Sequence, residues 1–275
     1  MAPNHESGAG AAGLPRITIL GSLNMDLVSY AVACGKLSRT SSLADPSAVV
    51  AMLGAVGSDA YGPVLTSSLA SYGVDVAEPH HPLPEANHSL RPEDFASLPA
   101  PLPDLLIMQL EIPLDTVLQA LAAARDATVP VLLNPAPAQP LPDDAYRGLA
   151  HLVVNETEAA ILSGCKESDL DDLPGMERIG AIFIGRGVQN VIITLGGRGV
   201  YYVTKSGKSA LVQALKANVV DTTAAGDTFV GSYALAAVKA GAADFDIDTA
   251  VRGGQPGCSH NSLPERSTSI HSVEG

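Results

Sequence analysis

The chain has 275 residues, of which 46% are hydrophobic and 16% are charged, and this apolar content excludes a mainly disordered protein. The 16 Lys and Arg residues stand against 29 Asp and Glu residues, so the formal net charge is −13. Such an acidic chain is not expected to bind nucleic acid, because phosphate backbones need basic patches. Aromatic residues are only 4% and Trp is absent, which also argues against a base-stacking platform.

The three cysteines, Cys34, Cys165 and Cys258, are far apart and form no CxxC pair, so we expect reduced thiols. Residues 1–15 contain no apolar core of the kind that a secretory signal needs. Nowhere do eighteen apolar residues follow one another, so we expect no membrane span. Together these features predict a cytoplasmic protein, with the nucleus as an additional compartment.

Short apolar runs alternate with helix-like patterns along the chain. We predict strands at residues 17–20, 49–56, 105–110, 129–133, 151–154 and 191–195. Helices are predicted from the apolar period behind Pro113, over residues 157–163 before Gly164, and from about Gly226. This alternation predicts an α/β fold with a three-layer, Rossmann-like, mostly parallel sheet. The predicted domain covers residues 16–251, between a disordered tail at 1–15 and an irregular tail at 252–275.

Several common nucleotide and catalytic motifs are absent from this sequence. Gly207-Lys208-Ser209 imitates the end of a Walker A loop, but Tyr202 occupies the place of its first glycine. We therefore interpret Gly207-Lys208 as a hairpin turn. No G-x-G-x-x-G follows the first strand, which disfavours a nicotinamide-dependent oxidoreductase, and no G-x-S-x-G is present. The pair His80-His81 has no third ligand at a zinc-like spacing.

The stretch 221–229 joins an apolar run to a predicted helix. Small residues at Ala224, Ala225 and Gly226 leave the first N–H groups of that helix uncovered, and these groups with the helix dipole favour a phosphate. Asp227 then lies in the first turn, where its carboxylate can accept a proton from an attacking hydroxyl. The alternative interpretation is that Asp227 only caps the helix.

This stretch closely resembles the C-terminal signature of the ribokinase-like (phosphofructokinase-B) sugar kinases. Further segments resemble the same family in the family's order, at residues 21–26, 106–114, 133–138, 155–158 and 194–199. The resemblance implies the family's fold and an ATP-dependent phosphorylation of a sugar. The segments around Gln109 and Asn134 favour D-ribose, phosphorylated at its 5-hydroxyl.

The resemblance also implies roles for individual residues. Asp227 is expected to be the base, and the amides of Ala225, Gly226 and Asp227 an anion hole. The sugar is expected to contact Asn24, Met25, Asp26, Glu111 and Asp227. ATP is expected to contact Asn155, Thr194, Leu195, Gly196, Gly197, Arg198, Gly199, Gly226 and Asp227. Glu158 is expected to organise Mg²⁺ through water, and Asp221 with Thr223 to hold K⁺.

Each of these residues also has an ordinary structural interpretation. Asn24 and Asp26 suit a turn, and Glu111 suits a solvated loop. Asn155 and Glu158 are favoured at the start of any helix. The glycines of residues 196–199 suit a plain hairpin turn.

Three segments depart from the family pattern. The family's Gly-Gly-Lys-Gly-Ala-Asn motif is absent, and the proline-rich residues 78–84 replace the strands of its β lid. After Val251, the sequence Arg252-Gly253-Gly254-Gln255-Pro256-Gly257-Cys258 is expected to break the helix. These losses suggest missing or altered segments, and they predict weak or no kinase activity and a doubtful homodimer. The alternatives to a ribose kinase are therefore an inactive, truncated binding protein and a related sugar or nucleoside kinase.

Overall fold

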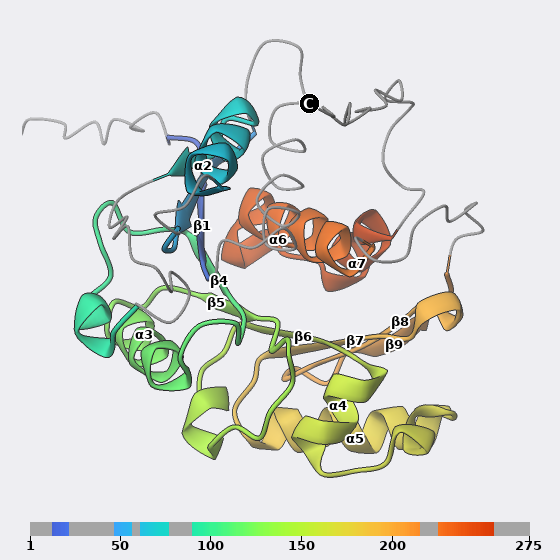
Figure 1. Ribbon diagram of the computed structural model, residues 1–275. Coiled ribbons are helices and arrows are strands. Elements are labelled where there is room, and N and C mark those ends of the chain that lie inside the picture. The colour runs from blue at the N-terminus through green and yellow to red at the C-terminus, as the bar shows by residue number, and fades with distance from the viewer. Residues whose placement is uncertain (1–12, 22–46, 57–60, 77–89, 215–224, 256–275) are drawn as a thin grey trace, which may run out of the picture.

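The computed structural model describes residues 13–21, 47–56, 61–76, 90–214 and 225–255. Its centre is a nine-stranded sheet in the order β3-β2-β1-β4-β5-β6-β7-β8-β9 (Figure 1). The strands are β1 (Arg16–Leu20), β2 (Val49–Leu53), β3 (Asp75–Val76), β4 (Leu105–Met108), β5 (Val131–Leu133), β6 (His151–Asn155), β7 (Asn190–Thr194), β8 (Val200–Thr204) and β9 (Ser209–Val212).

Strands β1 to β7 are all parallel, and β8 is antiparallel to both of its neighbours. The turn between β8 and β9 contains Gly207 at a φ of 90°, which confirms the predicted hairpin. Chain order reverses at β1, which has β2 on one side and β4 on the other. In sheets of this kind such a reversal leaves a crevice at the carboxyl ends of the strands, where ligands bind.

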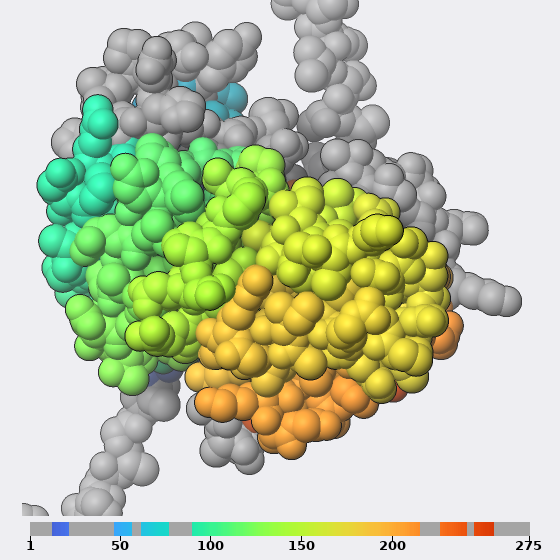
Figure 2. All heavy atoms as spheres, turned by 90° about the horizontal axis from the view of Figure 1, so that it is seen from below, coloured from blue at the N-terminus to red at the C-terminus, as the bar shows by residue number. Residues whose placement is uncertain are grey.

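Helices cover both faces of the sheet and complete three layers. They are α2 (Tyr61–Ser71), α3 (Leu114–Asp126), α4 (Glu156–Ser163), α5 (Leu173–Gly185), α6 (Ala225–Asp244) and α7 (Ile247–Gly254), with short 3₁₀ turns at Pro92–Phe95, Asp143–Tyr146, Glu167–Leu170 and Gly196–Arg198. Helices α3, α4 and α5 pack on one face, and α2, α6 and α7 on the other. Figure 2 shows the outer surface of the first group, in green to yellow.

Successive side chains of each strand point to opposite faces of the sheet, so the apolar core has two parts. In β4, Leu106 and Met108 pack toward α3, whereas Leu105 and Ile107 pack toward α6. Strands buried on both faces need apolar residues at every position, which explains the continuous runs in the sequence. The predicted fold class is confirmed.

The strand boundaries differ from the predicted ones by a few residues. β2 ends at Leu53 rather than residue 56, and β4 ends at Met108 rather than residue 110. The two-residue strand β3 was not predicted, because so short a strand has no period. The segments predicted to have lost the lid fall in residues 22–46 and 77–89, which lie outside the described residues.

The prediction of an irregular tail from residue 252 is wrong for residues 252–254, which form the last turn of α7. Gly254 packs so closely on Phe229 of α6 that an added Cβ would lie 2.9 Å from that ring. The glycine therefore permits the close contact between the two helices rather than ending α7 early. The following Gln255 is buried, and its amide donates to the carbonyl of Val212 at 3.5 Å. No helix in the described part of the chain is long and apolar enough to cross a membrane.

Candidate active site

Residues predicted to bind ligands lie together at the carboxyl ends of the parallel strands. Glu111 follows β4 by three residues, Asn155 ends β6 and Thr194 ends β7. Asn155 and Thr194 are direct partners in the β6–β7 ladder, and the Thr194 hydroxyl donates to the Val154 carbonyl at 3.4 Å. Pairing of β6 with β7 therefore brings two motifs that are almost 40 residues apart in sequence to one point.

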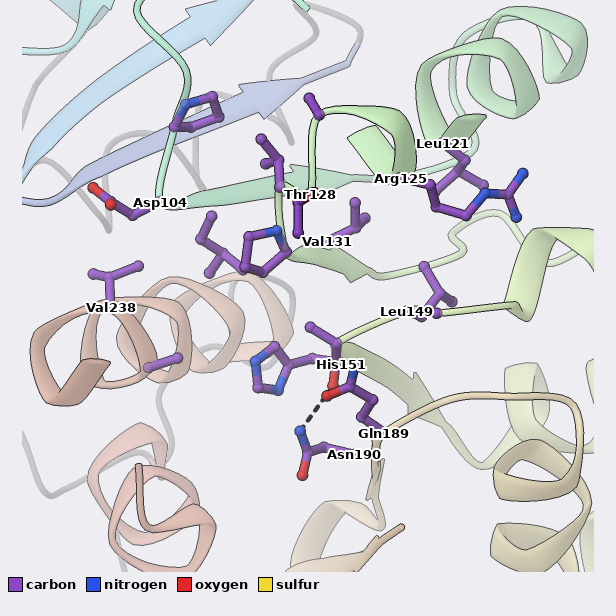
Figure 3. Close-up of a pocket in the computed structure, with 18 of the residues that line it drawn as sticks. Asp104, Leu121, Arg125, Thr128, Val131, Leu149, His151, Gln189, Asn190 and Val238 are labelled. Carbon is purple, nitrogen blue, oxygen red and sulfur yellow. Dashed lines mark hydrogen bonds between the residues drawn. The ribbon is translucent and has the colours of Figure 1, made fainter. Parts of the chain in front are cut away.

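Helix α6 brings its first turn to the same edge. The Tyr233 hydroxyl lies 2.8 Å from Nδ1 of His151, the first residue of β6. Asp227 lies six residues before Tyr233, which is about 9 Å along a helix axis. The farther end of α6 reaches the amino ends of the strands, where Val238 lies near His151 (Figure 3). Helix α6 therefore runs opposite to the parallel strands, with Asp227 toward their carboxyl ends.

The start of α6 leaves room for a ligand. Gly226 is exposed, and no atom of the described residues lies within 4 Å of the position that a Cβ would take. Asp227 is half-buried in the first turn. The first N–H groups of a helix have no acceptor within the helix, and together with the positive end of the helix dipole they favour an anion at such a position. Ala225 is the first residue of α6.

Asn155 and Glu158 form a reciprocal cap on α4. The side chain of Asn155 accepts from the N–H of Glu158 at 2.8 Å, and a carboxylate oxygen of Glu158 accepts from the N–H of Asn155 at 2.9 Å. Gly164 ends the helix with a φ of 74°, as predicted. Asn155 and Glu158 therefore do cap a helix start, as their alternative, purely structural interpretation predicts. Burial raises the pKa of the Glu158 carboxyl, and the hydrogen bond from Asn155 partly offsets this.

The cap uses only one of the two carboxylate oxygens of Glu158. Mg²⁺ prefers oxygen ligands and usually keeps several waters, so this single carboxylate suits a water-mediated contact. No group of three or more His, Cys, Asp or Glu residues that could hold a metal occurs among the described residues. The described donors thus fit Mg²⁺ held mainly by a ligand and water rather than by a protein cage.

The segment Thr194–Gly199 is a tight turn between β7 and β8. The N–H of Leu195 donates to the Gly199 carbonyl at 2.8 Å, and the Leu195 side chain is buried in the core. Only the backbone of Leu195 is therefore available to a nucleotide. Gly197 faces open space, whereas Gly199 has a φ of 102° and no room for a Cβ beside the Val212 carbonyl. The close approach at Gly199 is to β9, not to a ligand.

Arg198 was predicted to contact ATP, but its side chain is engaged elsewhere. Its guanidinium forms an ion pair with Glu156 and donates to the Leu170 carbonyl at 2.7 Å. The side chain therefore ties the turn to the start of α4 and to the 3₁₀ turn that ends at Leu170.

Five predicted site residues lie outside the described residues: Asn24, Met25, Asp26, Asp221 and Thr223. Two buried residues at the same edge were not predicted to have a role. Asn134, directly after β5, donates to the Val153 carbonyl at 2.9 Å and so fixes the end of β5 against β6. Gln109, directly after β4, is only 3% exposed. Their signal in the sequence was a polar residue that immediately follows an apolar strand.

A surface groove of about 860 Å³ lies at the opposite edge of the sheet. Its lining includes His151 and Asn190, the first residues of β6 and β7, and Asn190 donates to the Ala150 carbonyl at 2.8 Å (Figure 3). The groove faces the amino ends of the parallel strands, so it is separate from the predicted ligand site.

The sequence matches the pfkB family carbohydrate kinase model over residues 81–255, and the chain belongs to that family of kinases. It is 37% identical to the ribokinase of Schizosaccharomyces pombe over 268 residues, covering 79% of this chain and 83% of that protein. It is 29% identical to the ribokinase of Haemophilus influenzae over 308 residues, covering 94% of this chain and 98% of that protein.

Solved structures of the family share the fold. The ribokinase from Giardia lamblia matches with a TM-score of 0.74 and 23% identity, over 88% of this chain and 90% of that chain. The ribokinase of Arabidopsis thaliana, complexed with ribose and ATP, matches with a TM-score of 0.72 and 20% identity, over 87% and 90% of the two chains.

Both sequence alignments contain more positions than the number of residues that this chain contributes to them. The first has 268 positions, whereas 79% of 275 residues is about 217. The second has 308 positions, whereas 94% of 275 residues is about 258. In each case, therefore, about fifty positions inside the aligned region lack a residue of this chain. This supports the predicted loss of internal segments.

Proposed function

We propose that this protein is an ATP-dependent ribokinase, which transfers the γ-phosphoryl group of ATP to the 5-hydroxyl of D-ribose. The observation that carries the proposal is the position of Asp227, in the open first turn of α6 at the carboxyl edge of the sheet. The two ribokinases that are 37% and 29% identical to this chain support ribose as the sugar.

The chemistry follows from the position of the carboxylate. Asp227 accepts the proton of the 5-hydroxyl as its oxygen attacks the γ-phosphorus, and ADP leaves with the electrons of the broken P–O bond. The N–H groups of Ala225, Gly226 and Asp227 stabilise the negative charge on the phosphoryl oxygens. Glu111 holds the sugar, and the backbone of Thr194–Gly199 holds the nucleotide beside Asn155.

Mg²⁺ supplies charge neutralisation for the phosphates when it is bound. Glu158 would hold the ion through a water molecule, and its hydrogen bond from the N–H of Asn155 fixes the orientation of its carboxylate. K⁺ remains a prediction, because Asp221 and Thr223 lie outside the described residues. An acidic protein can still bind ATP in this way, since the site uses backbone N–H groups and a metal rather than a basic patch.

A related substrate is a second candidate. The sequence is 34% identical over 170 residues to the deoxyribokinase of Salmonella typhi, covering 61% of this chain and 53% of that protein. A panel of D-ribose, 2-deoxy-D-ribose and nucleosides in a coupled ADP-release assay distinguishes the candidates. D-ribose should give the highest kcat/KM, and a higher value for another compound would replace it as the substrate.

A ligand-binding protein with little or no kinase activity is the third candidate, because about fifty positions of its relatives have no counterpart here. Loss of segments that exclude water from a phosphoryl-transfer site lowers the rate. We therefore expect a kcat well below that of complete ribokinases. A homodimer is doubtful without the lid segments, which light scattering will test. A cytoplasmic or nuclear location is a further expectation, which fractionation of the source cells will test.

A further inference from the structure

Gln109 lies at the point where the order of the strands reverses. Leu20 of β1 pairs with Met108 of β4, so Gly21 and Gln109 follow side by side at the carboxyl ends of these strands. Successive side chains along a strand point to opposite faces of the sheet, so the side chain of Gln109 lies on the same face as Leu105 and Ile107. Helix α6 covers that face. Asp227 lies in the first turn of that same helix, at the same edge.

The amide of Gln109 is buried without hydrogen bonds to the described residues. Its side chain is only 3% exposed, and neither Nε2 nor Oε1 has a partner in the described part of the chain. Both atoms would lie 2.3 Å from a Cβ at position 21, so Gly21 leaves the space that the amide occupies. Buried polar groups without partners are costly and rare in folded proteins, and such a group at a site is normally satisfied by a ligand or water.

An amide presents one donor group and one acceptor group side by side. A hydroxyl also donates and accepts, so a polyol can satisfy both atoms, whereas an anion satisfies only the N–H groups and a cation only the oxygen. We propose that Gln109 is a specificity-determining residue of this kinase, whose amide hydrogen-bonds a hydroxyl of the sugar bound at the reversal point. This inference rests on the proposed function.

The test compares Gln109→Met, which keeps the shape of the side chain and removes its polar atoms, with the wild-type protein. Isothermal titration with D-ribose should show a Kd about tenfold higher for the variant, while its unfolding temperature without sugar equals or exceeds that of the wild type. Gln189→Met makes the same chemical change at an exposed position on the opposite edge and should alter neither quantity. Gln109→Glu, which is nearly isosteric, is the second variant in case the methionine protein does not fold, and it should also bind D-ribose more weakly.

Monodeoxy sugars identify the hydroxyl that the amide contacts. For one of the 2-deoxy, 3-deoxy and 5-deoxy analogues of ribose, the wild-type protein should bind the analogue more weakly than it binds D-ribose. The Gln109→Met protein should bind that analogue and D-ribose equally well. Equal binding of D-ribose to the wild type and both variants would overturn the inference and leave the proposed function intact. A lower unfolding temperature for Gln109→Met without sugar would also overturn it, because the amide would then be satisfied within the protein. Absence of sugar binding by the wild type would overturn the proposed function and the inference together.

Discussion

The guanidinium of Arg198 pairs with the carboxylate of Glu156, and this contact joins the turn after β7 to the first residue of α4. The two residues are 42 positions apart, yet both lie beside the ladder pair Asn155 and Thr194. The contact therefore links the segment predicted to bind the nucleotide with the segment predicted to organise Mg²⁺.

Glu156→Gln should loosen this link. Both side chains are partly exposed, so the loss of stability should be about 1 kcal/mol or less. The KM for ATP should rise several-fold while the KM for the sugar stays constant, because the turn at 196–198 loses one of the contacts that hold it and the sugar site is not touched. Asp143→Asn removes the partner of Arg186, in an ion pair away from the site, and is the matched control. An unchanged KM for ATP in Glu156→Gln would show that the turn keeps its position without this ion pair.

Asp227→Asn should abolish most of the activity without unfolding the protein. Loss of a general base lowers kcat by roughly 10² to 10⁴-fold, whereas sugar and nucleotide binding depend mainly on other groups. Steady-state kinetics and titration calorimetry measure the two effects separately. Asp115→Asn makes the same change in the first turn of α3 and should retain full activity. If an observed kinase activity survives the change at Asp227, the assignment of the base is wrong.

Gly199→Ala and Gly197→Ala should separate the structural glycine from the one that faces a ligand. At Gly199 the new Cβ would lie 2.0 Å from the Val212 carbonyl, and the φ of 102° is strained for alanine. We expect a loss of more than about 2 kcal/mol, seen as a clear fall in unfolding temperature. At Gly197 there is open space, so stability should change by less than ~0.5 kcal/mol. A raised KM for ATP in Gly197→Ala would indicate close approach of the nucleotide, and an unchanged KM would count against it.

His151 should make the protein sensitive to mild acid. Burial lowers the pKa of His151 to about 4, while the unfolded chain has the ordinary value near 6.5. Between these values the unfolded state binds a proton and the folded state does not, so stability falls as the pH drops from 6.5 toward 4. The loss is on the order of 3 kcal/mol when complete.

Urea unfolding at a series of pH values measures this effect. His151→Gln keeps an acceptor for the Tyr233 hydroxyl but cannot titrate, so its stability should fall less steeply over the same range. Carboxylates contribute equally to both proteins, and the difference between the two curves isolates His151. Identical slopes would mean that His151 is charged in the folded protein at these pH values.

The strands and the layer order could be predicted because each parallel strand is an apolar run that is buried on both faces. The runs at residues 151–154 and 191–195 correspond closely to β6 and β7 for this reason. Pairing was not predictable from either run alone, since it depends on contacts between distant segments. The neighbouring positions of Asn155 and Thr194 therefore emerged only from the structure.

The candidate site was predicted through motifs, and its side-chain contacts were not. Arg198 carries the charge expected of a nucleotide contact, but its partner Glu156 is 42 residues away and invisible to any local pattern. Leu195 belongs to the motif through its backbone, while its side chain is part of the core. No role was predicted for Gln109, because the sequence does not show that its buried amide lacks hydrogen-bond partners among the described residues.

The contact between Gly254 and Phe229 has a practical consequence for shortening the protein. Phe229 lies two residues after Asp227, so the last turn of α7 helps to hold the first turns of α6 in place. A version cut after residue 251 would uncover an aromatic ring next to the proposed base and would also lose the Gln255 contact to β9. A trimmed protein for crystallisation should therefore extend at least to Gln255.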